Sequence, residues 1–217
     1  MAPLLQKIDN EFLKNIHTGN YHTPTMYFHP NPAVRWLFWE RLNQITNLLT
    51  RSNISTKRCL DFGGGSGIFL PTLCSLFDEV ILVDIDPSQA RIIQEKFNLG
   101  NCTILEKNIY KCEFDHIDCI IAADVIEHFE DTTMILNKLK SLMNNQTILI
   151  SSLPTENWLY GFLRFLFRQE KPFDHYHPSK SIQKVFKELG FNNMAKSRIP
   201  LPGPFNLFDI DCWQKHV

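Results

Sequence analysis

The chain has 217 residues, enough to bury a hydrophobic core, and its 44% hydrophobic and 21% charged residues are ordinary for a globular protein. The formal net charge of -1 gives no global field that would attract a polynucleotide, so we expect no nucleic-acid partner. The six cysteines include no CxxC pair, and the histidines lack metal-ligand spacing, which favours free thiols and no bound metal. The N-terminus lacks the apolar run of a signal peptide and no stretch approaches the ~20 residues of a membrane span, so we expect one domain, 1–217, in the cytoplasm.

From about residue 55, short apolar runs alternate with helical patterns, which is typical of a parallel sheet covered by helices. Strands are expected at 58–62, 79–83, 103–106, 117–122 and 146–151. Helices are expected at 67–77, 87–97, 132–143 and 181–190, followed by two final strands. Residues 1–50 read as an N-terminal helical cap, 56–152 as the core, and 153–217 as an acceptor-side segment with the last strands.

A glycine-rich turn, DFGGGSG, joins the first expected strand to the next helix. Glycine allows a sharp turn and a close approach of the backbone to a ligand. The dinucleotide pattern GxGxxG fails here, because counting from Gly63 places Ile68 at the third glycine. The pattern that fits is acid-x-G-x-G-x-G from Asp61, and Asp84 ends the next strand, where an acid accepts hydrogen bonds from ribose hydroxyls.

The successive segments DFGGGSG, ILVDIDPS, KNIYKCEFDHIDCIIAADVIEHFED and ILISSLP resemble the motifs of class I S-adenosylmethionine-dependent methyltransferases, in order. The resemblance covers about residues 56–192 and is strongest to the group that includes the ubiquinone-biosynthesis O-methyltransferases. It implies a Rossmann-like α/β fold with a seven-stranded, mostly parallel sheet whose last strand is antiparallel. It also implies S-adenosyl-L-methionine as cofactor and S-adenosyl-L-homocysteine as product.

The same resemblance implies which residues bind the cofactor. The glycine turn would carry the methionine and ribose parts, Asp84 the ribose, Ile85 and the segment after strand three the adenine, and the end of strand four the methionine moiety. The matching positions are Asp61, Gly63, Gly64, Gly65, Asp84, Ile85, Asn108, Ile109, Ala123 and Asp124. Asn108 stands where the family usually has an acid, although an amide oxygen can accept the same bond from the adenine amino group.

Methyl transfer from a sulfonium needs alignment of the acceptor more than it needs a base, and a general base helps when the nucleophile arrives protonated. His128 follows strand four at the carboxyl edge of the sheet, where open α/β sheets bind ligands. His175 and His177 lie in the region that usually forms the acceptor pocket. We take His128 and His175 as candidate catalytic residues; packing under the cofactor and a surface loop are the alternatives.

The N-terminal stretch YHTPTMYFHPNPAVRW combines aromatic rings with a cation. Related enzymes close an N-terminal segment over the cofactor, so we expect Tyr21, Tyr27, His29 and Arg35 to line the site. Tyrosine faces stabilise sulfonium cations, and an arginine can pair with the cofactor carboxylate. Plain helix packing is the alternative for each of these residues.

The segment NWLYGFLRFLF is largely aromatic or aliphatic. Such a segment can form an apolar wall for the acceptor, a dimer surface, a buried lid helix, or a peripheral lipid contact through 158–168. We expect a small hydrophobic or aromatic methyl acceptor, and a monomer or homodimer.

Two other functions stay open at this point. One is a non-catalytic protein that binds the same cofactor, since no base is certain from the residues. The other is an NAD(P)-binding oxidoreductase, which the failed third glycine and the missing Tyr-x-x-x-Lys pair disfavour. Methylation of RNA or protein lacks both a basic stripe and an Asn/Asp-Pro-Pro-Tyr/Phe motif after strand four.

Overall fold

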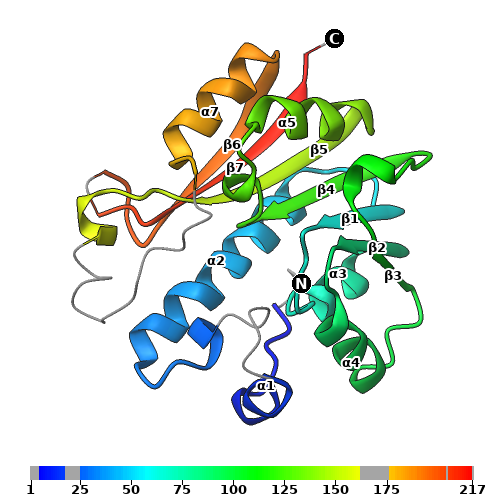
Figure 1. Cartoon of the computed structure of the whole chain (residues 1–217), viewed down its shortest axis with the longest axis vertical. Helices are drawn as coiled ribbons and strands as arrows, with labels where there is room; N and C mark the ends of the chain where they lie inside the picture. Colours follow the sequence, from blue (N-terminus) through cyan, green and yellow to red (C-terminus); the bar gives the residue numbers. More distant parts are fainter. Residues whose placement is uncertain (1–4, 18–24, 162–175, 204, 217) are drawn as a thin grey trace.

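The structure is a computed structural model that describes residues 5–17, 25–161, 176–203 and 205–216 (Figure 1). The strands are β1 Arg58–Phe62, β2 Glu79–Asp84, β3 Cys102–Glu106, β4 Ile117–Ala123, β5 Met143–Pro154, β6 Phe191–Ile199 and β7 Phe208–Lys215. The α-helices are α1 Asn10–Ile16, α2 Pro32–Arg51, α3 Leu70–Leu76, α4 Ser88–Lys96, α5 Thr132–Ser141 and α7 Ser179–Glu188. Short 3-10 turns occur at η1 Thr25–Phe28, η2 Ile109–Lys111 and η3 Ile126–His128.

The seven strands form one sheet in the order β3-β2-β1-β4-β5-β7-β6. β1 to β5 pair in parallel, and β7 runs antiparallel to both of its neighbours, which confirms the expected Rossmann-like α/β sheet with an antiparallel last strand. The chain turns outward from β1 to β2 and β3, then returns to add β4 and β5 on the other side. The carboxyl ends of β1 and β4 therefore meet at the switch point where open α/β sheets bind ligands.

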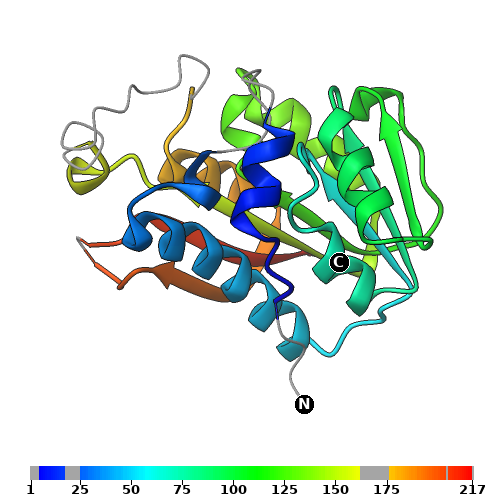
Figure 2. The same ribbon diagram turned by 90° about the horizontal axis from the view of Figure 1, so that it is seen from below.

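Helices bury both faces of this sheet, which explains why the central strands β1, β2 and β4 are largely apolar (Figure 2). Side chains from α1, α2, α3 and α4 pack on one face, against residues such as Cys59, Leu82 and Ile121. Side chains from α5 and α7 pack on the other face, against residues such as Leu60 and Ile120. None of the helices in the described part of the chain is both long and apolar enough to cross a bilayer.

Several observed bounds differ from the expected ones at the element ends. The helix after the glycine turn begins at Leu70 because residues 67–69 complete the turn, and α4 begins at Ser88, whose N–H donates to Asp86 Oδ1 (3.2 Å). β5 extends from Met143 to Pro154, because β7 pairs with it from Ile148 to its end.

A buried ion network joins β7 to β6. Arg198 on β6 pairs with two carboxylates of β7, at 2.7 Å from Nε to Asp209 Oδ1 and 3.1 Å from Nη2 to Asp211 Oδ1. From α7, Ser179 donates to Asp209 and Gln183 donates to Asp211. The two buried carboxylates of β7 thus hold both α7 and the edge strand β6.

Replacing Arg198 with Ala is expected to lower the free energy of unfolding by about 3 kcal/mol, because two buried carboxylates lose their cation. Urea denaturation measures this loss. The matched control is Lys184→Ala, which removes an exposed pair with Glu188 and should change stability by less than about 1 kcal/mol. Equal midpoints for the two variants would show that the network contributes nothing.

Candidate functional site

The glycine turn lies directly after β1 and depends on the absence of side chains. Gly63 and Gly67 have φ angles of 69° and 75°, in the left-handed region that side chains disfavour. A Cβ on Gly63 would lie 2.3 Å from Val125 Cγ2, and one on Gly67 would lie 2.8 Å from Ala90 Cβ. The turn is therefore packed closely between the end of β4 and the start of α4, and these positions require glycine for steric reasons.

Asp84, the last residue of β2, braces this turn. Its Oδ2 accepts a hydrogen bond from the Gly65 N–H (2.8 Å), and its Oδ1 accepts one from the Asp86 N–H (2.9 Å). A carboxylate has about four acceptor positions, so Asp84 retains capacity for the hydroxyls of a ribose. Ile85, the next residue, exposes 75% of its surface, so its apolar side chain is available to contact a planar ring.

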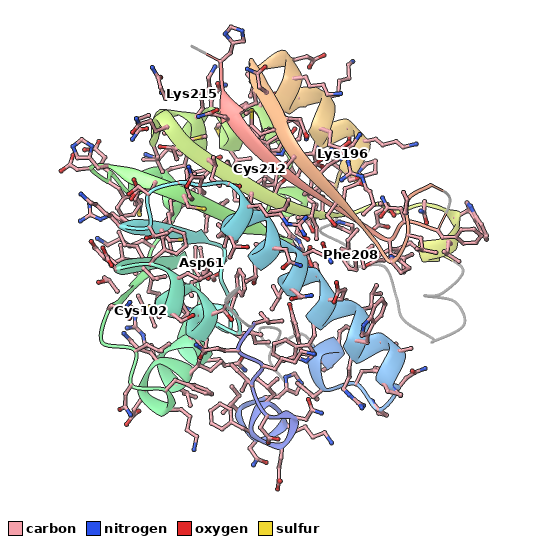
Figure 3. The ribbon with its side chains drawn as sticks, turned by 180° about the vertical axis from the view of Figure 1, so that it is seen from behind. Asp61, Cys102, Lys196, Phe208, Cys212 and Lys215 are labelled. Atoms are coloured by element: carbon pink, nitrogen blue, oxygen red, sulfur yellow. The ribbon has the colours of Figure 1, made fainter. Side chains whose placement is uncertain are left out.

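Asp61 lies beneath the turn and is 3% exposed. Its Oδ2 has no hydrogen-bond partner among the residues that the structure describes, and a Cβ on Gly64 would come within 2.5 Å of it. Burial, and secondarily the negative charge of Asp84, raise the pKa of Asp61 from 3.8 to about 7. Figure 3 shows Asp61 on the half of the molecule that carries β1, β2 and β3.

A buried cation lies at the end of β4. Arg41 of α2 is 4% exposed and forms an ion pair with Asp124, which follows β4 with a left-handed φ of 53°. Its Nη2 also donates to the Tyr27 hydroxyl (2.6 Å), and its guanidinium lies 5.4 Å and 5.2 Å from the ring centres of Phe38 and Phe208. Figure 3 shows Phe208 where the end of β5 and α2 approach β7. The pair brings an anion and a cation together at the carboxyl edge of the sheet.

Sequence reasoning missed Arg41. The signal was a positive charge in the middle of the apolar pattern of α2, since a charge on a buried helix face needs a partner. The expected cation was instead Arg35, near the start of the same helix. Arg35 Nη1 donates to the carbonyl oxygens of His29 (2.6 Å) and Pro30 (3.0 Å), and its side chain lines a surface groove with Lys7 and Trp36.

The other expected lid residues are placed as follows. Tyr27 is 3% exposed and contacts Arg41, so it lies at the site edge. His29 Nδ1 accepts a hydrogen bond from the Asn31 N–H (3.1 Å) at the start of α2. Tyr21 lies outside the described residues. That these residues line the cofactor site stays a prediction.

The segment after β3 carries the expected adenine contacts. Asn108 is exposed, and its Oδ1 accepts a hydrogen bond from the Tyr110 N–H (3.0 Å), which begins η2. The second lone pair of this oxygen is the one that an adenine amino group would use. Ile109 is buried against the face of the sheet that carries α5 and α7.

The histidine candidates lie around η3. His128 is half-buried at the end of η3, and its backbone N–H donates to Val125 O (3.2 Å). His177 uses a ring nitrogen to contact the Glu130 carbonyl oxygen (2.9 Å), and the Tyr176 N–H donates to Glu127 O (3.0 Å). η3 with the loop after it and the segment 176–177 therefore lie side by side. His175 lies outside the described residues, and within them no three His, Cys, Asp or Glu side chains group as metal ligands would.

Replacing Gly63 with Ala is expected to lower the free energy of unfolding by about 2 kcal/mol or more, because the left-handed backbone and the contact with Val125 both oppose a methyl group. Gly100→Ala is the matched control: no atom lies within 4 Å of its added Cβ, so its change should stay within about 0.5 kcal/mol. Chemical denaturation compares the two variants. A tolerated Gly63→Ala would contradict the close packing of the turn.

Comparison with known proteins identifies the family of the chain. A family described as a methyltransferase domain matches residues 34–196. Over 117 residues the chain is 29% identical to the ubiquinone biosynthesis O-methyltransferase of Rhodopseudomonas palustris strain TIE-1; the match covers 52% of the chain. It covers 46% of that relative, so the chain matches about half the length of this curated protein.

Solved structures show the same fold at low identity. The N-methyltransferase NodS from Bradyrhizobium japonicum WM9, in complex with S-adenosyl-L-homocysteine, aligns with a TM-score of 0.70 and 14% identity, over 96% of this chain and all of NodS. Magnesium protoporphyrin IX methyltransferase from Synechocystis PCC 6803, with the same molecule bound, aligns with a TM-score of 0.68 and 17% identity, over 95% and 94% of the two chains. The match of the family to three quarters of the sequence, together with this fold, shows that the chain belongs to the methyltransferase-domain family.

Proposed function

We propose that the protein is an S-adenosylmethionine-dependent methyltransferase that acts on a small molecule. The observation that carries the proposal is the glycine turn at the switch point, braced by Asp84 through the Gly65 N–H. The turn presents backbone at close range without side chains, and the carboxylate that holds it has acceptor positions left for ribose hydroxyls. The chain belongs to a methyltransferase-domain family, and two solved structures with the same fold hold S-adenosyl-L-homocysteine, which supports the same cofactor for this chain.

Arg41 and Asp124 fit the amino-acid end of this cofactor. A methionine moiety carries a carboxylate and an ammonium group, and each needs an opposite charge when it leaves water. Arg41 would receive the carboxylate and Asp124 would face the ammonium group. Both residues are already oriented at the end of β4, with the Tyr27 hydroxyl holding the guanidinium in place. This arrangement reduces the ordering that binding requires.

The cofactor would supply the activated methyl group, so this chain has to hold the acceptor in line and exclude water. The half-buried His128 lies on η3 directly after the Asp124 segment, where it could accept a proton from an acceptor hydroxyl or amine. Its role as base is part of the proposal. A non-catalytic cofactor-binding protein would share the turn and the arginine but would transfer no methyl group.

We also propose a hydrophobic or aromatic acceptor. Trp158, Leu201 and Phe205 expose 65%, 60% and 53% of their surfaces. They belong to two uncharged stretches, 157–161 and 199–208, that contact each other, since Asn157 Nδ2 donates to Asn206 O (2.5 Å). Tyr160 packs edge-on against Phe208, the ring that also encloses Arg41. The apolar stretches thus adjoin the site through Phe208. Lipid contact through 158–168 and the oligomeric state stay predictions, and 162–168 lie outside the described residues.

A cytoplasmic location is also part of the proposal. All six cysteines are free thiols, and five of them are buried. Free thiols in this number are typical of a reducing compartment.

The two arginines of α2 provide a matched test of cofactor contact. Arg41→Met should weaken S-adenosyl-L-homocysteine at least tenfold in isothermal titration calorimetry, because the ligand carboxylate loses its charged partner. Arg35→Met should change the dissociation constant less than twofold, since this side chain holds carbonyl groups of its own loop. A loss in Arg35→Met with none in Arg41→Met would instead support the assignment expected from the sequence.

The activity itself is tested by transfer of a tritiated methyl group from S-adenosyl-L-methionine to a panel of phenols, hydroxylated quinones and aromatic amines. We expect label in at least one acceptor, and a thermal shift with S-adenosyl-L-homocysteine but not with NADH. A shift with NADH alone would indicate the oxidoreductase alternative. Cofactor binding without transfer to this panel or to cell-extract metabolites would indicate the non-catalytic alternative.

A further inference from the structure

Asp61 is a buried acid whose environment opposes its charge. One of its carboxylate oxygens has no hydrogen-bond partner among the described residues, which is costly for an ionised group. The side chain shares a face of the sheet with Cys59 on its own strand, because alternate residues of a strand point the same way. It lies directly under Gly64 of the turn that is proposed to carry the cofactor.

The charged groups around Asp61 do not supply a counter-ion. Asp84 at the end of β2 adds a second negative charge, and burial together with this charge raises the pKa of Asp61 to about 7. α3 contributes no charged residue. The thiol of its Cys74 forms a hydrogen bond with the thiol of Cys102 on β3, and this bond raises the pKa of Cys102. Burial raises the pKa of Cys59 as well, so the Cys59 and Cys102 thiols are neutral near pH 7.

Among the residues that the structure describes, the remaining elements on this face place no cation against Asp61 either. The first turn of α4 presents Ser88, Gln89 and Ala90, and the next residue, Arg91, is an exposed partner of Glu106. α2 contributes Arg41, which is engaged by Asp124. At the end of α1, His17 packs edge-on against Phe28. A cation that enters the site would therefore meet two acids at the turn, one of them holding a proton.

We propose that Asp61 distinguishes the positively charged methyl donor from the neutral product: donor binding drives its proton into the solvent, whereas the empty or product-bound site binds the proton more strongly. The inference rests on the proposed function. The donor and the product differ by one methyl group and by the positive charge on sulfur. Since the turn above Asp61 carries the ligand, a new positive charge there favours the ionised carboxylate, and its loss after methyl transfer restores the proton. The site would then weaken its hold on the product.

Proton linkage tests this directly. For an acid with a pKa of about 7, the ionised fraction rises about eightfold between pH 6.0 and pH 7.5. In the wild type, the dissociation constant of the product divided by that of the donor should therefore rise by up to about eightfold over this pH range. Calorimetry at pH 7.0 in phosphate and in Tris should show the release of about half a proton on donor binding and much less on product binding.

The variant Asp61→Asn should bind the donor without this proton release. Its ratio of product to donor dissociation constants should stay constant over the same pH range, apart from titration of the ligands themselves. Asp78→Asn, at an exposed turn before β2, is the matched control and should behave as the wild type. A wild-type ratio that does not change with pH overturns the inference whether or not Asp61→Asn folds. Absence of binding by both nucleosides would instead overturn the proposed function.

Discussion

The site depends on one hydrogen bond, from the Gly65 N–H to the carboxylate of Asp84. This bond ties the turn after β1 to the end of β2, and it fixes the backbone at the point where the sheet reverses its direction of growth. Side chains are excluded there, since Gly63 lies against Val125 and Gly67 against Ala90. The turn, the brace and the packing of β4 and α4 are therefore one structural unit, and a change in any of them would move the ligand-facing backbone.

Around this unit, the N-terminal helices place the charges that the sheet does not provide. α2 packs on the same face as α3 and brings Arg41 to the end of β4, where Tyr27, Phe38 and Phe208 enclose it. Asp124 pairs with this guanidinium among the aromatic rings and so offsets the cost of burying its charge. The N-terminal cap therefore contributes a charged group to the site and is more than a cover for the sheet.

The order of strands and helices could be predicted from the sequence because β1, β2 and β4 are largely apolar on both faces and the turns after them carry Gly, Pro or Asp. The positions of Asp61, Asp84 and Asp124 followed from their places at strand ends, where parallel strands bring them to one edge. Arg41 could not be found in this way, because its ion pair joins residues 83 positions apart and depends on how α2 crosses the sheet. The raised pKa of Asp61 has the same origin, since it results from three-dimensional burial.

The most direct test of the site is an ¹⁵N–¹H NMR titration of the backbone amides with S-adenosyl-L-homocysteine. The account predicts the largest shifts at Gly63, Gly65 and Ile85, with further shifts around Asp124 and in α2 near Arg41. Saturable shifts that instead concentrate in the surface groove beside Lys7 and Trp36, with the glycine turn unchanged, would contradict it.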